Sequence, residues 1–315
     1  MPSITQALFR NLRALVPQKY YVHFNNAFEA ILWMLPTKTR IRIYYYKSFQ
    51  SFPNFRNPKT FNEKCQWLKL AGDERLAVCT DKVAAKGYVA ERIGNDLLIP
   101  TLFHGRKLPP LAKRDWPFPY VIKANHGAGF NIFVRSKNDL DWPNIEAKVN
   151  EWLSRKYGYL GGELYYTRIK PQVLVEPFVS EDGDLPPVYK IFVFNGVPKY
   201  ISIQAALRNI RVGRPFYDIF WNRQSFRLGD PPDSTEYQRP VCLAQMLAAA
   251  SKIGRNFGFV SVDFYAIAGR PYFSEMEFTP DCGLNKFYPT EMDLALGDLW
   301  PIPVIQHAGY MGIRF

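Results

Sequence analysis

Strand-like and helical patterns follow one another along most of the chain. The strand-like runs lie at residues 119–124, 172–179, 188–194, 197–203, 259–267 and 271–278. Between them, residues 144–157 and 240–257 have the pattern of helices. Asn195-Gly196 separates two neighbouring runs and is a strong signal for a two-residue β-hairpin turn. This mixture predicts an α+β fold.

The N-terminal part of the chain has a different character. It reads as helices interrupted by Pro17, Pro36, Pro53 and Pro58. A basic aromatic run extends from Arg40 to Lys47. We expect residues 1–70 to form a basic, mostly helical accessory segment. It either contacts a membrane surface or an acidic polymer, or packs as a cap on the main fold with its charges in solvent. Further along, a helix is expected from Thr80, as its N-cap, to Gly94, as its C-terminal stop.

The charge of the chain is unevenly distributed. The 315 residues carry a net charge of +12, which points to an anionic partner. Residues 1–60 hold nine Lys and Arg side chains against Glu29 alone, so about two-thirds of the excess lies there. No nucleic-acid recognition motif accompanies this charge, and a nucleic-acid partner is therefore not expected.

Cysteine spacing and hydropathy bear on the compartment. The four cysteines are far apart and form no C-x-x-C pair, which fits a reducing cytoplasm better than a disulfide framework or a zinc site. The apolar stretch from Ala27 to Leu35 is too short to span a membrane, and no signal peptide is visible. We expect a cytoplasmic protein, either soluble or held peripherally at the inner face of the membrane.

Several catalytic motifs are missing from the sequence. It contains no G-x-x-x-x-G-K-[ST] loop, no H-E-x-x-H and no G-x-S-x-G. Gly127-Ala-Gly129 departs from the dinucleotide fingerprint, because Ile132 stands where the third glycine should be. With four histidines in all, a histidine-rich metal site is not expected.

The segment 259–278 carries the most informative pattern. It reads as a hairpin, and with Gly269 at the centre of the turn Asp263 lies opposite Glu275, while Glu277 shares their face. Three neighbouring carboxylates repel one another, and a divalent cation with oxygen ligands removes the conflict. Asp263, Glu275 and Glu277 therefore suit Mg²⁺ with a nucleotide. The alternative is a solvated acidic face on the strands.

Weaker signals lie upstream. Residues 119–131 read as a strand that carries Lys123 and ends in a loop with Gly127 and Gly129, where backbone N–H groups can face a phosphate. His126 in this loop is more typical of a hydrogen-bonding residue than of a catalytic base. Lys82 opposes the dipole of its predicted helix. The strand 172–179 carries Glu176 and a proline, which suits an edge strand with free backbone groups.

Taken in order, these segments resemble the ATP-grasp superfamily. The matching residues are Asp81-Lys82, Val121 to Asn131, Val173 to Val179, Asp263 and Glu275-Met-Glu277. Three motifs are similar to the TupA-like branch, which is associated with bacterial surface polysaccharides: Asn125 to Gly129, Tyr189 to Gly196 and Phe278 to Gly283. The resemblance covers roughly residues 60–300 and leaves the basic N-terminal segment outside.

The resemblance implies an ATP-grasp fold, in which two α+β subdomains clasp ATP, and it implies roles for particular residues. Lys82 and Lys123 would hold ATP phosphates, the loop with His126, Gly127 and Gly129 would close over them, and Glu176 to Val179 would read adenine. Asp263, Glu275 and Glu277 would hold Mg²⁺. The predicted units are an N-terminal subdomain at 71–118, a nucleotide-binding subdomain at 119–180 and a metal-binding and substrate subdomain at 181–315.

The sequence departs from the pattern of the superfamily in two places. Many relatives have asparagine at the position of Glu277, and many ligases have an arginine near Ser261 or Thr279 to steady an acyl phosphate. Arg208, Arg211 and Arg214 could supply that charge, or could form one solvated face. We take Lys123, Lys190 and Arg211 as the candidate catalytic residues.

These expectations lead to one function and two alternatives. The main hypothesis is an ATP-dependent carboxylate–amine ligase that works through an acyl phosphate and attaches an amino acid to a uronic acid of a surface polysaccharide or its precursor. A glycosyltransferase of polysaccharide biosynthesis is one alternative. A non-catalytic basic module that binds a membrane or an acidic polymer is the other.

Overall fold

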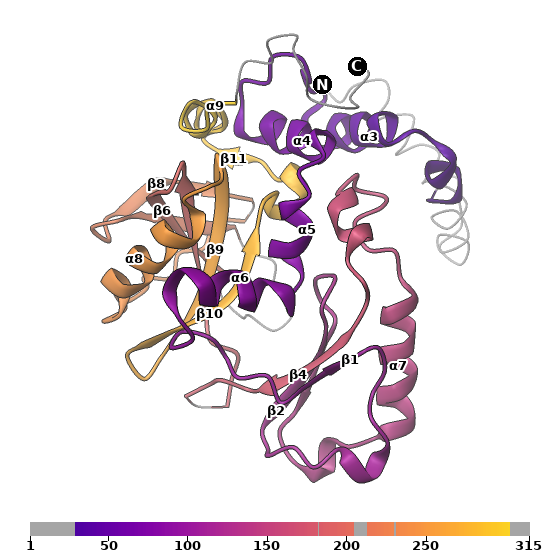
Figure 1. Cartoon of the computed structure of the whole chain (residues 1–315). Helices are drawn as coiled ribbons and strands as arrows, with labels where there is room; N and C mark the ends of the chain where they lie inside the picture. Colours follow the sequence, from indigo (N-terminus) through magenta and orange to yellow (C-terminus); the bar gives the residue numbers. More distant parts are fainter. Residues whose placement is uncertain (1–28, 182, 205–212, 230, 303–315) are drawn as a thin grey trace.

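A computed structural model describes residues 29–181, 183–204, 213–229 and 231–302 of the chain. In this part, two antiparallel sheets are arranged around a group of helices (Figure 1). The smaller sheet lies beside helix α7 (Trp142–Ser154), and the larger one lies beside α8 (Leu243–Gly254). The α+β class predicted from the sequence is confirmed.

The four-stranded sheet has the order β1-β4-β2-β3. Its strands are β1 (Phe103–Gly105), β2 (Tyr120–Ala124), β3 (Asn131–Val134) and β4 (Val173–Pro177). Apolar residues of these strands and of α7 form its core, with Ile122 and Val134 fully buried. The strand predicted at 172–179 is therefore β4, but the edge position predicted for it is wrong. It pairs with β2 on one side, and β1 covers Val173 to Val175 on the other.

The seven-stranded sheet has the order β10-β9-β5-β6-β7-β8-β11, and every pair in it is antiparallel. Its strands are β5 (Val188–Phe194), β6 (Val197–Gln204), β7 (Arg214–Asp218), β8 (Arg223–Leu228), β9 (Phe259–Ile267), β10 (Arg270–Glu277) and β11 (Phe287–Tyr288). Asn195 and Gly196 both have positive φ between β5 and β6, so the predicted two-residue hairpin turn is confirmed.

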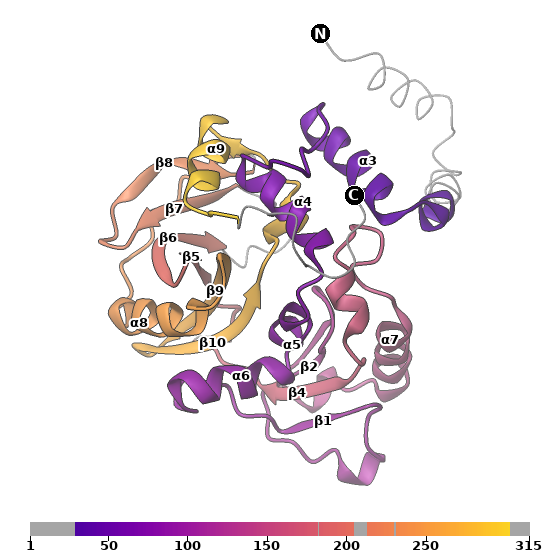
Figure 2. The same cartoon turned by 45° about the horizontal axis from the view of Figure 1, so that its top comes forward.

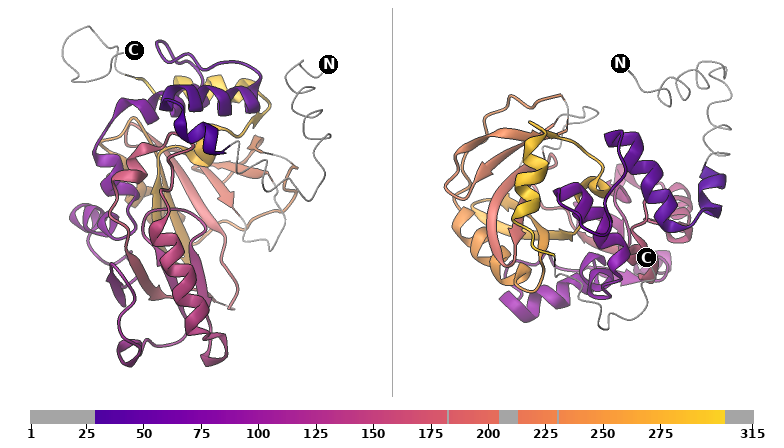
Figure 3. Two further views of the ribbon diagram at one scale, coloured as in Figure 1. Left: turned by 90° about the vertical axis from the view of Figure 1, so that its right-hand side faces the viewer. Right: turned by 90° about the horizontal axis from the view of Figure 1, so that it is seen from above.

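Helices cover both faces of this large sheet (Figure 2). On one face, α8 packs against β5, β6 and β9, and α5 (Arg75–Thr80) and α6 (Ala84–Ile93) complete that core. On the other face, α4 (Phe61–Ala71) and α9 (Glu291–Asp298) lie against each other. Seen from the side and from above, α3 (Thr37–Phe49) continues this second layer (Figure 3). Short 3-10 helices complete the fold: η2 (Leu111–Lys113), η3 (Lys137–Asp139), η4 (Leu164–Arg168) and η5 (Pro280–Gly283).

Phe61 anchors α4 on the large sheet. Its side chain is 1% exposed, and its ring contacts those of Phe192, Phe259 and Trp300 at centroid distances of 4.7–5.9 Å. The helix begins with a capping box, in which Thr60 accepts from the Glu63 N–H and Glu63 accepts from the Thr60 N–H. The last helix of the predicted accessory segment thus packs into the core of the large sheet.

The predicted start of the next helical segment is wrong. Thr80 is the last residue of α5, where its Oγ1 donates to the Leu76 carbonyl, 2.7 Å away. Asp81 lies between the two helices, where its Oδ1 accepts from the N–H of Val83 at 2.9 Å, and α6 begins at Ala84. The predicted end is confirmed, because Gly94 follows the last residue of α6.

The β9–β10 hairpin has the predicted pairing of Asp263 with Glu275, but its turn and its strand register differ from those predicted. Its turn has two residues, Ala268 and Gly269, which both have positive φ. A regular ladder from this turn would set Asp263 opposite Ser274. A β-bulge between Phe273 and Glu275 takes up one residue, so that Glu275 lies opposite Asp263.

Candidate active site

A row of charged side chains crosses three strands of the large sheet. Lys190 on β5 lies directly opposite Asp263 on β9, and Asp263 lies directly opposite Glu275 on β10. Because facing residues of neighbouring strands point to the same side, the three side chains share one face. Lys190 Nζ donates to Asp263 Oδ2 and, at 3.0 Å, to Glu277 Oε2. The structure thus brings the three predicted carboxylates and Lys190 together.

This row occupies one end of a face whose other end is aromatic. Lys190 is followed on the same face by Phe192, and Asp263 is preceded on it by Phe259. The opposite face carries Val260, Val262, Phe264, Met276 and Phe278, all buried as predicted. Asp263 is wholly buried, whereas the side chains of Glu275 and Glu277 are 37% and 26% exposed, so the acidic face is solvated only at its β10 edge.

In this row, burial and neighbouring opposite charges shift the pKa of each group in opposite directions. Burial raises the pKa of the Asp263 carboxyl to about 6, and the Lys190 ammonium opposes this rise. For Glu275, burial also favours the neutral form, but Lys82 and Lys190 outweigh it and bring the pKa down to about 2. The pKa of Lys190 is raised, because its acidic neighbours outweigh the burial of its ammonium.

Lys82 connects this row to the small sheet. Its Nζ donates to Glu275 Oε2 at 2.9 Å and to the carbonyl of Gly127 at 3.0 Å. Gly127 belongs to the loop between β2 and β3, so a single ammonium contacts both halves of the site. This matches the predicted neighbourhood of Lys82 and the glycine loop.

Asn125 fixes the position of Lys82, although sequence reasoning gave it no role of its own. Its side chain is wholly buried, and its Nδ2 donates to Asp81 Oδ1 at 2.9 Å. Its backbone carbonyl accepts from the Lys82 N–H at 3.1 Å, and its Oδ1 accepts from the Gln172 N–H at 2.7 Å. Asn125 therefore joins the loop, the start of α6 and the approach to β4. A buried asparagine cannot be told from an exposed loop residue by sequence alone.

The glycine loop is tightly packed at one position and free at another. A Cβ on Gly127 would stand 2.7 Å from the Phe130 ring and 2.9 Å from the Tyr157 ring, so only glycine fits there without movement. Gly129 has open space around it but φ of +77°. His126 is buried, with its ring nitrogens 3.3 Å from Asn125 Oδ1 and 3.3 Å from the Arg155 carbonyl. Burial lowers the pKa of His126, which favours a neutral imidazole.

A second charged group lies on the small sheet. Lys123 Nζ donates to Glu176 Oε2 at 2.7 Å, and Lys86 on α6 forms an ion pair with the other oxygen of the same carboxylate. Glu176 is 4% exposed, and burial alone would raise its pKa, but the two ammonium groups bring the pKa below its usual value. Sequence reasoning missed Lys86, because a lysine four residues after Lys82 looks like any exposed helical lysine. Val179 is half-buried two residues after β4, and its role in reading adenine stays a prediction.

Two of the three candidate arginines, Arg208 and Arg211, lie outside the described residues. Arg214, at the start of β7, forms an ion pair with Asp281 and donates to Gln204 Oε1 at 3.3 Å. Asp281 and Cys282 have positive φ in the loop that follows Glu277. Arg214 therefore reaches the segment next to the carboxylates, while the role predicted for Arg211 stays a prediction.

The three carboxylates have the type of donor atom that suits Mg²⁺, but their contacts in the structure are with lysines. In residues 29–302 without the gaps named above, no three acidic, histidine or cysteine side chains stand ready to hold a metal ion. The three carboxylates face lysines instead. Their oxygen-only donor set is the one that Mg²⁺ prefers, and the Ser202 hydroxyl, opposite Lys190 in the same row, is buried without a hydrogen-bond partner among the described residues.

Two antiparallel α+β units, with converging lysines and carboxylates and a glycine loop between them, define an ATP-grasp protein. A model of the family described as TupA-like ATPgrasp matches residues 63–300 of the sequence. The chain belongs to this family, and the resemblance found in its motifs is confirmed.

Three solved structures are similar to this chain at low sequence identity. D-alanine–D-alanine ligase from Helicobacter pylori is 19% identical, with 71% of this chain and 62% of that chain covered and a TM-score of 0.40. The ATP complex of the D-alanine–D-alanine ligase from Bacillus anthracis is 16% identical, with 64% and 56% covered and a TM-score of 0.39. The ADP complex of the N5-carboxyaminoimidazole ribonucleotide synthetase purK is 14% identical, with 69% of this chain and 50% of that chain covered and a TM-score of 0.39. The match thus spans between half and about three-fifths of those chains. A comparison with curated proteins gave no match.

Two further findings concern membrane-spanning helices and the cysteines. Among the described residues, no helix has the length and apolar character needed to cross a membrane. Cys65, Cys79, Cys242 and Cys282 are all free thiols.

Proposed function

We propose that this protein is an ATP-dependent carboxylate–amine ligase that uses Mg²⁺. The observation that carries the proposal is the row of Lys190, Asp263 and Glu275, joined to the glycine loop through Lys82. It supports the proposal because a phosphoryl-transfer site needs cations for phosphate oxygens and carboxylates for a divalent metal in one place.

The residues of the site have different roles in binding ATP and Mg²⁺. Lys82 and Lys123 hold phosphates, and the backbone of the loop with Gly127 and Gly129 lies over them. The last residues of β4 and the two that follow it, from Glu176 to Val179, contact adenine. Asp263, Glu275 and Glu277 would hold Mg²⁺, which when bound neutralises charge on the phosphate oxygens.

The reaction proceeds in two displacements. An oxygen of the substrate carboxylate attacks the γ-phosphorus of ATP, the bond to the β,γ-bridging oxygen breaks, and ADP leaves. The amine then attacks the acyl carbon, inorganic phosphate leaves, and the amine nitrogen gives up a proton. Lys123 and Lys190 stabilise the negative charge that develops on the transferring group, and Arg211 or Arg214 steadies the acyl phosphate. Exclusion of water protects this intermediate from hydrolysis.

We propose a uronic acid of a bacterial surface polysaccharide, or its precursor, as the carboxylate and an amino acid as the amine. The family name and the positive charge of the chain support this choice. The protein would work in the cytoplasm, where residues 1–60 contact an acidic polymer or the inner face of the membrane.

A paired screen tests the activity. Purified protein is incubated with Mg-ATP and all combinations of uronic acids and amino acids, and ADP release is measured. We expect turnover only when both partners of one pair are present. Glu275→Gln should abolish this turnover, whereas Glu91→Gln, whose side chain is 79% exposed on α6, should leave it unchanged.

The same protein preparation separates the two alternatives. Thermal stabilisation by UDP-sugars but not by Mg-ATP would favour the glycosyltransferase. A protein that binds acidic polymers as before after loss of Lys123 and Asp263, and that turns over no substrate pair, would be the non-catalytic module.

A further inference from the structure

A small pocket lies away from the charged row, between the end of α4, the start of α5 and η4. Its volume is about 140 Å³. Leucine side chains from the three elements and the ring of Tyr165 make its walls apolar; the leucines are Leu68, Leu70, Leu76 and Leu164. None of the lysines or carboxylates assigned above to ATP or Mg²⁺ lines it. It is therefore a separate feature of the molecule.

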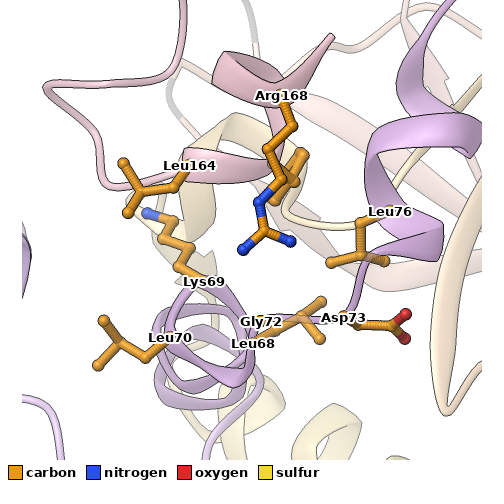
Figure 4. Close-up of a pocket in the computed structure, with 9 residues that line it drawn as sticks. Leu68, Lys69, Leu70, Gly72, Asp73, Leu76, Leu164 and Arg168 are labelled. Atoms are coloured by element: carbon orange, nitrogen blue, oxygen red, sulfur yellow. The ribbon is translucent and has the colours of Figure 1, made fainter. Parts of the chain in front are cut away.

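Arg168 brings a positive charge to this pocket. It is the last residue of η4, and its guanidinium points into the space between Leu164 and Leu76 (Figure 4). Within the described part of the chain, no carboxylate forms a salt bridge with it. An arginine over an apolar pocket can offer two parallel N–H donors to an incoming carboxylate.

The other two charged residues of the pocket are already engaged. Asp73 forms an ion pair with Arg75 at 2.7 Å, and its carboxylate points away from Arg168 (Figure 4). Lys69 contributes its aliphatic stem, because its Nζ donates to Gln66 Oε1 at 2.8 Å and to the Cys282 carbonyl at 2.7 Å. The pocket thus combines apolar walls with one available cation, Arg168. It has no free carboxylate that could bind the ammonium group of a ligand.

We propose that this pocket binds a small aliphatic or aromatic carboxylate, with the apolar part between the leucines and the carboxylate on Arg168. The size supports this class, since an apolar cavity of about 150 Å³ holds one benzene-sized group. Because Asp73 is engaged by Arg75, a simple carboxylate fits better than a zwitterionic amino acid. The inference does not depend on the proposed ligase activity.

Three probes that share the same carbon skeleton test the proposal. Binding of 4-methylpentanoate, its neutral amide 4-methylpentanamide and L-leucine to the full chain is measured by isothermal titration without nucleotide. We expect 4-methylpentanoate to bind about tenfold or more tightly than either of the others, because only it offers a carboxylate without an ammonium group. Saturating Mg-ATP should not displace it.

Matched variants locate the site. Arg168→Gln should weaken binding of 4-methylpentanoate about tenfold, and Leu164→Trp, which fills the cavity, should remove it. Arg106→Gln, a substitution of another exposed arginine, should have no effect. The unfolding temperature of each variant without ligand shows that the fold is kept. Unchanged binding in Arg168→Gln, equal affinity for acid and amide, displacement by Mg-ATP, or no binding of 4-methylpentanoate to the native chain would overturn the proposal.

Discussion

At the scale of single residues, the buried charges of the site are paired with opposite charges. Glu176 is buried between Lys86 and Lys123, and Asp263 is buried beside Lys190. A buried ion pair adds little net stability when both partners are present, but removal of one partner leaves the other charge buried and unpaired. The side chains proposed to bind ATP and Mg²⁺ therefore also affect the stability of the fold.

Glu176→Gln should destabilise the protein by about 3–5 kcal/mol at pH 7, because two ammonium groups lose their carboxylate. The pKa of Glu176 is lower in the folded chain than its ordinary value of 4.5, so its contribution is full above pH 4.5 and is lost as the pH falls from there through the lower pKa of the folded chain. The difference between variant and native protein should therefore shrink in acid. Urea unfolding at pH 7 and pH 4 measures it, and an equal difference at both values would contradict this assignment. Glu91→Gln is the control.

Gly127→Ala should lower the affinity for Mg-ATP about tenfold, because the new methyl group pushes the loop away from Phe130 and Tyr157. Gly87→Ala on α6 has nothing within 4 Å of the added Cβ and should leave nucleotide affinity unchanged while stabilising the helix by about 0.5–1 kcal/mol. Calorimetric titration with Mg-ATP and thermal unfolding compare the two. Equal nucleotide affinity in both variants would show that the packing of Gly127 is irrelevant to binding.

At the scale of elements, the sequence predicts the positions of strands better than the contacts that these strands make with distant segments. The predicted run 259–267 coincides with β9, but β1 has only three residues and leaves no recognisable pattern. The pairing of Asp263 with Glu275 was predicted from a turn centred on Gly269, and it is reached through a shorter turn and a bulge. The carboxylates could be found because like charges recur at strand spacing. Their lysine partners come from distant segments, and such long-range contacts have no local signal.

Phe61→Ala should destabilise the large sheet by about 3–5 kcal/mol, since its ring packs among Phe192, Phe259 and Trp300. Phe52→Ala removes a ring that is 65% exposed, and should cost less than about 0.5 kcal/mol. Denaturant unfolding of both variants measures the contrast. A small effect of Phe61→Ala would mean that α4 is an accessory helix, as the predicted boundary at residue 70 places it.

At the scale of the whole molecule, the charge of the chain is divided between two regions, the candidate active site and residues 1–60. The site itself nearly balances its lysines with carboxylates, whereas residues 1–60 carry most of the excess. Several of these basic residues are exposed, among them Arg42, Lys47 and Arg56. Exposed charges of one sign act together on a polymeric anion and are screened by salt.

Replacing Arg42, Lys47 and Arg56 by Gln should weaken binding to a polyuronate about tenfold at low ionic strength, and the difference should fade as salt is added. Replacing Lys113, Lys137 and Lys148, three exposed lysines elsewhere, lowers the net charge equally and should have a smaller effect. Co-sedimentation or titration at two salt concentrations gives the measurement. Equal weakening by both triple variants would mean that net charge alone governs the contact.

The two contacts of Lys82 have a consequence for selectivity. Its ammonium is shared between Glu275 and the Gly127 carbonyl, so an incoming anion must compete with groups that are already satisfied. A bare phosphate that takes Lys82 leaves Glu275 without the ammonium that donates to it, and a bare cation that takes Glu275 leaves Lys82 without its carboxylate partner. Only a ligand that delivers both charges at once compensates both sides of the exchange. With the roles proposed for Lys82 and Glu275, we expect the site to bind Mg-ATP in preference to free ATP or free Mg²⁺.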